Sequence, residues 1–145
     1  AVIKFNEGIW EMFKKFCNDP ARFVLGVCNG AQLMALMGLV PFRGLPEISQ
    51  PRFIRNDSSV FTCKWVQAKI LQNDCALLDG MAGSTIGVYV AHGEGKGYFP
   101  NPEVLEQTLE QGRAPIVYVD HNNESTGQFP WNPNGSQESI AAMCT

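Results

Sequence analysis

Residues 23–37 constrain the fold of this chain more than any other stretch, because strand-like residues give way to helix-like residues within three positions. An apolar, β-favouring run at 23–27 leads into three small residues that begin with Cys28. A helix-favouring run at 31–37 follows and ends at Gly38. This order predicts a strand, a sharp turn and a helix, with the cysteine at the corner. Such a unit is typical of layered α/β folds.

The residues around Cys28 are those that a nucleophilic cysteine requires. Unpaired N–H groups and the helix dipole stabilise a thiolate at a helix N-terminus. Gly26 and Gly30 flank the cysteine at the spacing of a nucleophile elbow, where bulky neighbours would block the tight turn. The backbone N–H of Asn29 then points to where an oxyanion would develop. The alternative is a buried structural cysteine, since free cysteines are often buried.

Composition narrows the class of protein. The 145 residues suit one domain, 1–145, without an internal linker. A net charge of −3 gives no basic surface, so we expect no nucleic-acid partner. No apolar run is long enough to span a bilayer, so we expect no membrane partner. The five cysteines are an odd number without C-x-x-C pairs, which favours a reducing, cytoplasmic location and argues against a metal site.

The first helix is predicted after Asn6, a good N-cap residue, with Phe5 packing on Trp10 as a hydrophobic staple. Its apolar stripe is expected to face the core, and Pro20 to end the segment. The stripe consists of Ile9, Trp10, Phe13, Phe16 and Cys17.

The remaining elements are mostly extended. Within residues 53–70 the apolar alternation changes parity between Trp65 and Val66, which predicts a β-bulge or a strong bend. Further strands are predicted at 86–91, 116–120 and from 140 onwards. A helix is expected between Asn101 and Gly112, on the surface.

His92 follows the predicted strand 86–91 and opens a glycine-rich run, 92–97. The run lacks the spacing of a P-loop, so its glycines are interpreted as sites where the backbone approaches a ligand closely. His92 is either a structural histidine or a residue near the functional site.

The segment Gly26-Val27-Cys28-Asn29-Gly30-Ala31-Gln32 resembles the nucleophile motif of class I glutamine amidotransferases. With asparagine after the cysteine, it is similar to the motif of the phosphoribosylformylglycinamidine synthases, also called formylglycinamide ribonucleotide amidotransferases. Five further segments resemble the C-terminal glutaminase domain of that family, in the same order: 51–56, 79–84, 91–95, 118–120 and 132–136.

The resemblance implies an α/β, flavodoxin-like layered fold, incomplete at both ends, with an added β-rich segment. It implies an enzyme that hydrolyses glutamine, with Cys28 as nucleophile, the Asn29 backbone N–H in the oxyanion hole, and Gln32 and His92 at the substrate. A solvated helix residue is the alternative for Gln32. The ammonia would serve a synthetase domain of the same protein, which converts formylglycinamide ribonucleotide to formylglycinamidine ribonucleotide with ATP and Mg²⁺. No cofactor is expected on this chain.

The sequence also departs from the family. Ala31 stands where a second cysteine is frequent. Neither His92 nor His121 is followed by Pro-Glu, so neither matches the triad histidine. We therefore expect an internal fragment of the glutaminase domain that is inactive alone and exposes a hydrophobic sheet edge. Two other functions stay open: another cysteine hydrolase with the same elbow, or a catalytically silent relative that acts as a structural or interaction domain.

Overall fold

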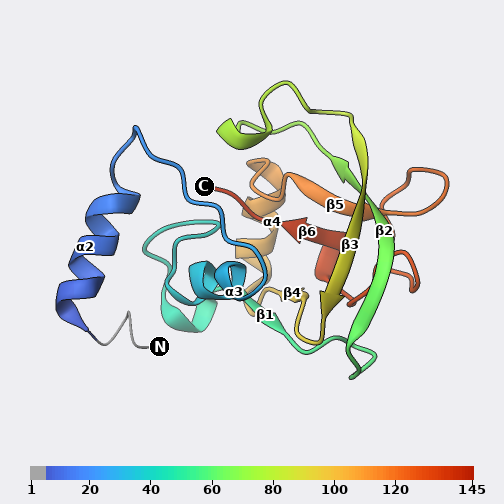
Figure 1. Cartoon of the computed structure of the whole chain (residues 1–145), viewed down its shortest axis with the longest axis horizontal. Coiled ribbons are helices and arrows are strands. Elements are labelled where there is room, and N and C mark those ends of the chain that lie inside the picture. The colour runs from blue at the N-terminus through green and yellow to red at the C-terminus, as the bar shows by residue number, and fades with distance from the viewer. Residues whose placement is uncertain (1–5) are drawn as a thin grey trace.

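The computed structural model describes residues 6–145, and the statements below concern that part of the chain. Its larger sheet has four strands in the order β3-β2-β5-β6, and every pair is antiparallel (Figure 1). The strands are β2 (Thr62–Ile70), β3 (Thr85–His92), β5 (Ile116–Val119) and β6 (Ile140–Ala142). The predictions for 86–91, 116–120 and the last strand are thus confirmed within a residue or two.

A second, two-stranded sheet joins β1 (Arg52–Ile54) to β4 (Lys96–Tyr98), also antiparallel. The described α-helices are α2 (Glu7–Cys17), α3 (Asn29–Leu36) and α4 (Pro102–Glu110). Short 3₁₀ turns complete the elements: η1 (Glu47–Ser49), η2 (Ala76–Leu78) and η3 (Gln137–Ser139). None of the helices within residues 6–145 has both the length and the apolar character needed to cross a membrane.

The predicted bulge in β2 is wrong. β2 pairs with β3 without interruption from Thr62 opposite His92 to Lys69 opposite Thr85. The change of parity has another cause: Val66 is buried on one face, whereas Trp65 is 69% exposed on the other. Trp65 instead packs edge-to-face on Tyr89, its direct partner across the pair, with ring centroids 5.7 Å apart. The two faces of a regular strand were therefore mistaken for one interrupted face.

The architecture is mixed α/β, as expected, but the flavodoxin-like layering is not formed by residues 6–145. Residues 22–27 are extended and belong to neither sheet, so the predicted strand 23–27 has no partner in the described part of the chain. Its alternate side chains are correspondingly exposed: Phe23 62%, Leu25 75% and Val27 71%. This segment is apolar and exposed, but it is not the edge of a sheet, so the expected exposed sheet edge is not formed by residues 22–27. Strand propensity alone does not form a sheet, because pairing needs a neighbouring strand.

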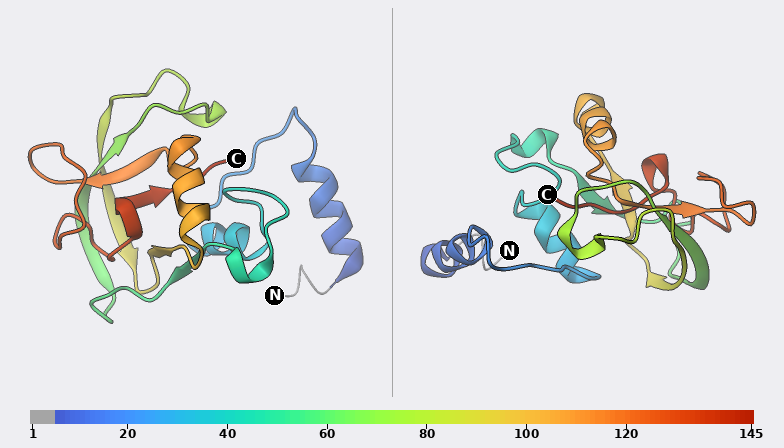
Figure 2. Two further views of the ribbon diagram at one scale, coloured as in Figure 1. Left: turned by 180° about the vertical axis from the view of Figure 1, so that it is seen from behind. Right: turned by 90° about the horizontal axis from the view of Figure 1, so that it is seen from above.

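The first helix begins where the sequence indicates, because the Asn6 side chain accepts a hydrogen bond from the Ile9 N–H at 3.1 Å. The Phe5–Trp10 staple involves a residue outside the described part. The expectation that the apolar stripe of α2 is core is wrong for residues 6–145, since none of its residues is buried. Figure 2 shows the reason: α2 stands at the end of the molecule opposite the four-stranded sheet.

The main core lies between α4 and the end of the sheet. Asn101 caps α4 with a 2.9 Å hydrogen bond from the Glu103 N–H, and Gly112 follows its last turn with φ +62°, as predicted. The helix buries Val104 and Thr108, and Val104 joins an apolar cluster that includes β6. The buried members are Phe99, Val104, Ala114 and Ile140.

Replacing Ile140 by alanine should lower the free energy of unfolding of this chain by about 2–5 kcal/mol. The side chain is 1% exposed and central in the cluster, so its loss leaves a cavity beside Phe99. Urea unfolding followed by tryptophan fluorescence measures the difference. Leu77→Ala is the matched control, because Leu77 is 48% exposed and should cost less than half as much. Equal losses for the two variants would contradict this packing.

Candidate active site

Cys28 occupies the turn between the extended segment 22–27 and α3. Its backbone lies at φ 56° and ψ −120°, a region that a residue with a Cβ rarely adopts. Its carbonyl oxygen accepts the N–H groups of Ala31 at 3.0 Å and Gln32 at 3.2 Å, which form the first turn of the helix. A strained residue at a sharp entry into a helix, with an exposed side chain, is the geometry of a nucleophile elbow.

The two flanking glycines differ in their surroundings. A Cβ added to Gly26 would lie 2.7 Å from the backbone carbon and oxygen of Gly30 and 2.9 Å from the Ala31 nitrogen. A Cβ added to Gly30 would meet no atom within 4 Å in the described structure. The steric reason predicted for a glycine therefore holds at Gly26, where the chain folds back on the first turn of α3, and not at Gly30.

Asn29 opens α3 directly after the cysteine. In residues 6–145 its backbone N–H meets no hydrogen-bond acceptor, as is usual for the first N–H groups of a helix. Its side-chain oxygen lies 4.0 Å from the Cys28 Sγ. A free N–H beside an exposed thiol can donate to an oxygen that gains negative charge when the sulfur attacks a carbonyl carbon.

Gln32 lies one helical turn beyond Cys28, and a hydrogen bond holds its side chain at the surface of the pocket. Its Nε2 donates a 3.1 Å hydrogen bond to the backbone oxygen of Glu94, in the glycine-rich loop that follows β3. This bond joins α3 to a loop sixty-two residues away in the chain. It gives the amide a defined position beside the nucleophile.

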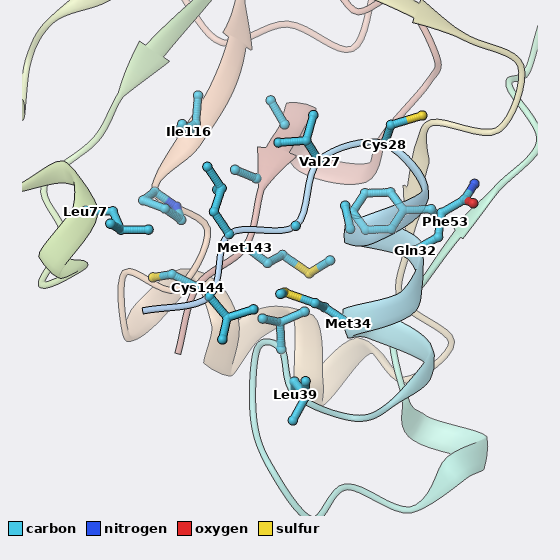
Figure 3. Close-up of a pocket in the computed structure, with 18 of the residues that line it drawn as sticks. Val27, Cys28, Gln32, Met34, Leu39, Phe53, Leu77, Ile116, Met143 and Cys144 are labelled. Carbon is cyan, nitrogen blue, oxygen red and sulfur yellow. The ribbon is translucent and has the colours of Figure 1, made fainter. Parts of the chain in front are cut away.

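A pocket of about 830 Å³ opens between α3, residues 22–28, η2, the loop after β3 and the C-terminal segment. It brings together all four residues predicted for the site: Cys28, Asn29, Gln32 and His92. Figure 3 shows apolar side chains, among them Val27, Met34 and Met143, gathered in its middle, while Cys28 and Gln32 point outward at one end. Cys28 and Gln32 thus lie together at one end of a hollow whose middle is apolar.

His92 is in the pocket wall, but its ring is engaged with the protein interior. Its Nε2 lies 3.5 Å from the Asn134 Nδ2, and its buried Nδ1 has no hydrogen-bond partner in residues 6–145. Burial lowers the pKa of His92 below its ordinary value of 6.5, so the ring is neutral at pH 7. A Cβ on Gly95 would lie 2.6 Å from the ring, which shows how closely the loop packs on it.

The other histidine of the chain, His121, is not part of this pocket. His121 follows β5 and packs on Trp131, with ring centroids 5.5 Å apart. No group of three or more histidine, cysteine or acidic side chains in residues 6–145 is arranged to hold a metal ion.

Two further thiols, Cys75 and Cys144, lie near each other in the pocket wall. Burial, followed by the adjacent Cys75, raises the pKa of Cys144 to about 11. Because the thiolate is the reactive form, alkylation of Cys144 by iodoacetamide should rise about tenfold for each pH unit between 8 and 10.

Peptide-resolved mass spectrometry measures these rates. In the urea-unfolded chain the same cysteine should approach its maximal rate above about pH 9, near the ordinary pKa of a thiol. A folded chain in which alkylation of Cys144 is already constant above pH 9 would contradict the raised pKa.

No role is assigned from the sequence to two buried amides, Asn56 and Asn134, that contact the loop at 92–95. Both are 2% exposed and bond to it directly. Each lies in a segment that resembles the amidotransferases, 51–56 and 132–136. A polar residue inside a segment that resembles the family was therefore the available signal, but nothing local to either segment assigns it a partner.

Comparison with known proteins places the whole chain in one family. A family model described as a CobB/CobQ-like glutamine amidotransferase domain matches residues 1–145. Among curated proteins, the chain is 45% identical over its full length to a probable phosphoribosylformylglycinamidine synthase, chloroplastic/mitochondrial, of Arabidopsis thaliana. It is 42% identical over 99% of its length to phosphoribosylformylglycinamidine synthase of Dictyostelium discoideum, and 34% identical over its full length to that of Homo sapiens.

The chain covers only 10%, 11% and 12% of these three relatives, respectively, so it corresponds to a short part of each. The family model nevertheless matches every residue of the chain, and the elbow, the free N–H and the anchored glutamine lie within that match. The chain therefore belongs to the CobB/CobQ-like glutamine amidotransferase domain family.

Proposed function

We propose that this chain is the glutaminase part of a phosphoribosylformylglycinamidine synthase, which hydrolyses glutamine through Cys28 and supplies the ammonia to the rest of the enzyme. The observation that carries the proposal is the backbone of Cys28, held at φ 56° where α3 begins. Strain of this kind persists where the surrounding structure enforces it and is concentrated at active sites. The relatives that match the whole chain bear the name of this synthase.

In the proposed reaction the Cys28 Sγ attacks the side-chain amide carbon of glutamine. A C–S bond forms, the carbonyl oxygen becomes an oxyanion, and the Asn29 N–H donates to it. Collapse of this intermediate breaks the C–N bond, and the nitrogen leaves as ammonia after gaining a proton. Water then attacks the thioester carbon, which releases glutamate and restores the thiol.

Proton transfer in this scheme relies on groups outside residues 1–145. The ring of His92 is directed at Asn134, and His121 packs on Trp131 away from the pocket. We therefore propose that a histidine and a glutamate elsewhere in the protein act as proton carrier and orienting residue. The 145 residues alone should release no ammonia from glutamine.

The proposal also includes a complete flavodoxin-like sheet and a synthetase part of the same protein. Residues 22–27 would become a strand of a flavodoxin-like sheet when a neighbouring strand is present, because they are already extended and expose alternate apolar side chains. ATP and Mg²⁺ would bind to the synthetase part, and ammonia would react there with formylglycinamide ribonucleotide. A cytoplasmic location stays a prediction, and the Arabidopsis relative carries a chloroplastic/mitochondrial name.

The test uses the full-length protein with ATP, Mg²⁺, formylglycinamide ribonucleotide and glutamine carrying ¹⁵N in its side-chain amide. The account predicts equal amounts of glutamate and of an amidine product that contains the ¹⁵N. A product without ¹⁵N in the presence of unlabelled ammonia would contradict the glutaminase role. Absence of glutamate release in an otherwise folded protein would favour the silent relative.

A further inference from the structure

The glycine-rich loop after β3 is fixed by hydrogen bonds to its backbone from two distant segments. The Asn56 N–H donates to Gly93 O at 2.9 Å, and its Nδ2 donates to His92 O at 2.8 Å. The Gly95 N–H donates to Asn56 Oδ1 at 3.0 Å. From the other side, the Asn134 Nδ2 donates to Gly95 O at 2.7 Å. The loop thus has little freedom to move away from α3.

Both amides are buried, and their remaining contacts fix how each one is oriented. The Asn56 Nδ2 also donates to Val60 O at 3.1 Å, so it faces oxygen atoms and its Oδ1 faces an N–H. The Asn134 Oδ1 accepts from Ser136, from its N–H at 3.0 Å and its hydroxyl at 2.7 Å. An aspartate has the same shape but no donor, and it would place a charged oxygen against the carbonyl oxygens of the loop.

The fixed loop in turn holds Gln32. In the sequence, Glu94 stands between Gly93 and Gly95, to whose backbones the asparagines bond. The Glu94 backbone oxygen accepts the 3.1 Å hydrogen bond from the Gln32 Nε2. Since Gln32 stands one turn after Cys28 on α3, the loop determines where its amide lies in the pocket. A shift of the loop would leave the nucleophile in place and displace Gln32.

We propose that Asn56 and Asn134 are positioning residues for glutamine binding, which act through the Glu94 carbonyl on Gln32. This inference rests on the proposed glutaminase function. It assigns the two asparagines an effect on the affinity for glutamine and none on the attack by Cys28. Loss of either should raise KM for glutamine and change kcat little.

The experiment compares Asn56→Asp and Asn134→Asp in the full-length protein, with glutamine or with ammonia as the nitrogen source. KM for glutamine should rise at least tenfold, while ammonia-dependent turnover should stay within twofold of the wild type. Thr108→Val is the matched control, because it removes a buried 2.6 Å hydrogen bond to Val104 O in α4, away from the loop. It should lower the melting temperature without changing KM for glutamine.

A Gln32→Met background separates positioning from general damage. If the asparagines act through Gln32, Asn56→Asp should add no further increase in KM in that background. Independent, multiplicative increases would overturn the inference, as would an unchanged KM in the single variants. If an aspartate variant fails to fold, the uncharged Asn56→Ser and Asn134→Ser replace it, with the same expected KM.

These outcomes distinguish failure of the positioning role from failure of the proposed glutaminase function. A wild type that releases no glutamate contradicts both the proposed function and the inference. A wild type that does, together with variants that lose glutamine-dependent and ammonia-dependent turnover in parallel, contradicts the inference alone.

Discussion

Cys28→Ala should lower glutamine-dependent turnover of the full-length protein by at least about 10⁴-fold, because the variant has no atom to form the thioester. Turnover with ammonia should stay within about twofold, since the synthetase part needs no thiol to use free ammonia. Steady-state assays with each nitrogen source measure the two effects in one preparation.

Cys63→Ala is the matched control for the nucleophile. Cys63 is also an exposed thiol, but it lies on β2 outside the pocket. This variant should retain both activities. Loss of ammonia-dependent turnover in Cys28→Ala would show damage beyond the glutaminase reaction, and glutamine-dependent turnover above a hundredth of the wild type would contradict a nucleophilic Cys28.

Gly26→Ala should reduce glutamine-dependent kcat/KM by about 10²-fold while leaving Cys28 itself in the chain. The added Cβ would lie 2.7 Å from backbone atoms of Gly30, so the first turn of α3 must shift. That shift moves the Asn29 N–H away from the developing oxyanion. Kinetics with glutamine and with ammonia measure the loss, and only the former should fall.

Gly127→Ala is the control for this backbone change. An added Cβ there would meet no described atom within 4 Å, and Gly127 does not have a positive φ. It should therefore behave as wild type. Wild-type kinetics in Gly26→Ala would mean that the elbow does not depend on the close approach of residues 26 and 30.

Local sequence signals predicted most of the elements and the position of Cys28 at the turn before α3. Asn6 and Asn101 cap their helices, Gly112 ends α4, and Cys28 stands at an elbow, because these features depend on a few neighbouring residues. Asn29, Gln32 and His92 line the same pocket as Cys28, as the resemblance implied, although the roles assigned to them stay predictions.

Features that depend on distant contacts were not predictable in the same way. Whether residues 23–27 pair in a sheet depends on a neighbouring strand, and the described structure offers none. β2 has apolar residues on both of its faces, and this pattern resembles that of a bulged strand. Trp65 packs on Tyr89 of the neighbouring strand on one face, while Val66 faces the core on the other. The loop contacts of Asn56 and Asn134 span 36 to 42 residues, beyond any local pattern.

The most direct test of the central claim is chemical labelling of the full-length protein with a diazo-ketone analogue of glutamine, followed by intact mass and peptide mapping. The account predicts one adduct, on Cys28, that excess glutamine suppresses and that Cys28→Ala abolishes. No adduct, or equal labelling of the other cysteines with no protection by glutamine, would contradict a glutamine-binding pocket around an activated Cys28.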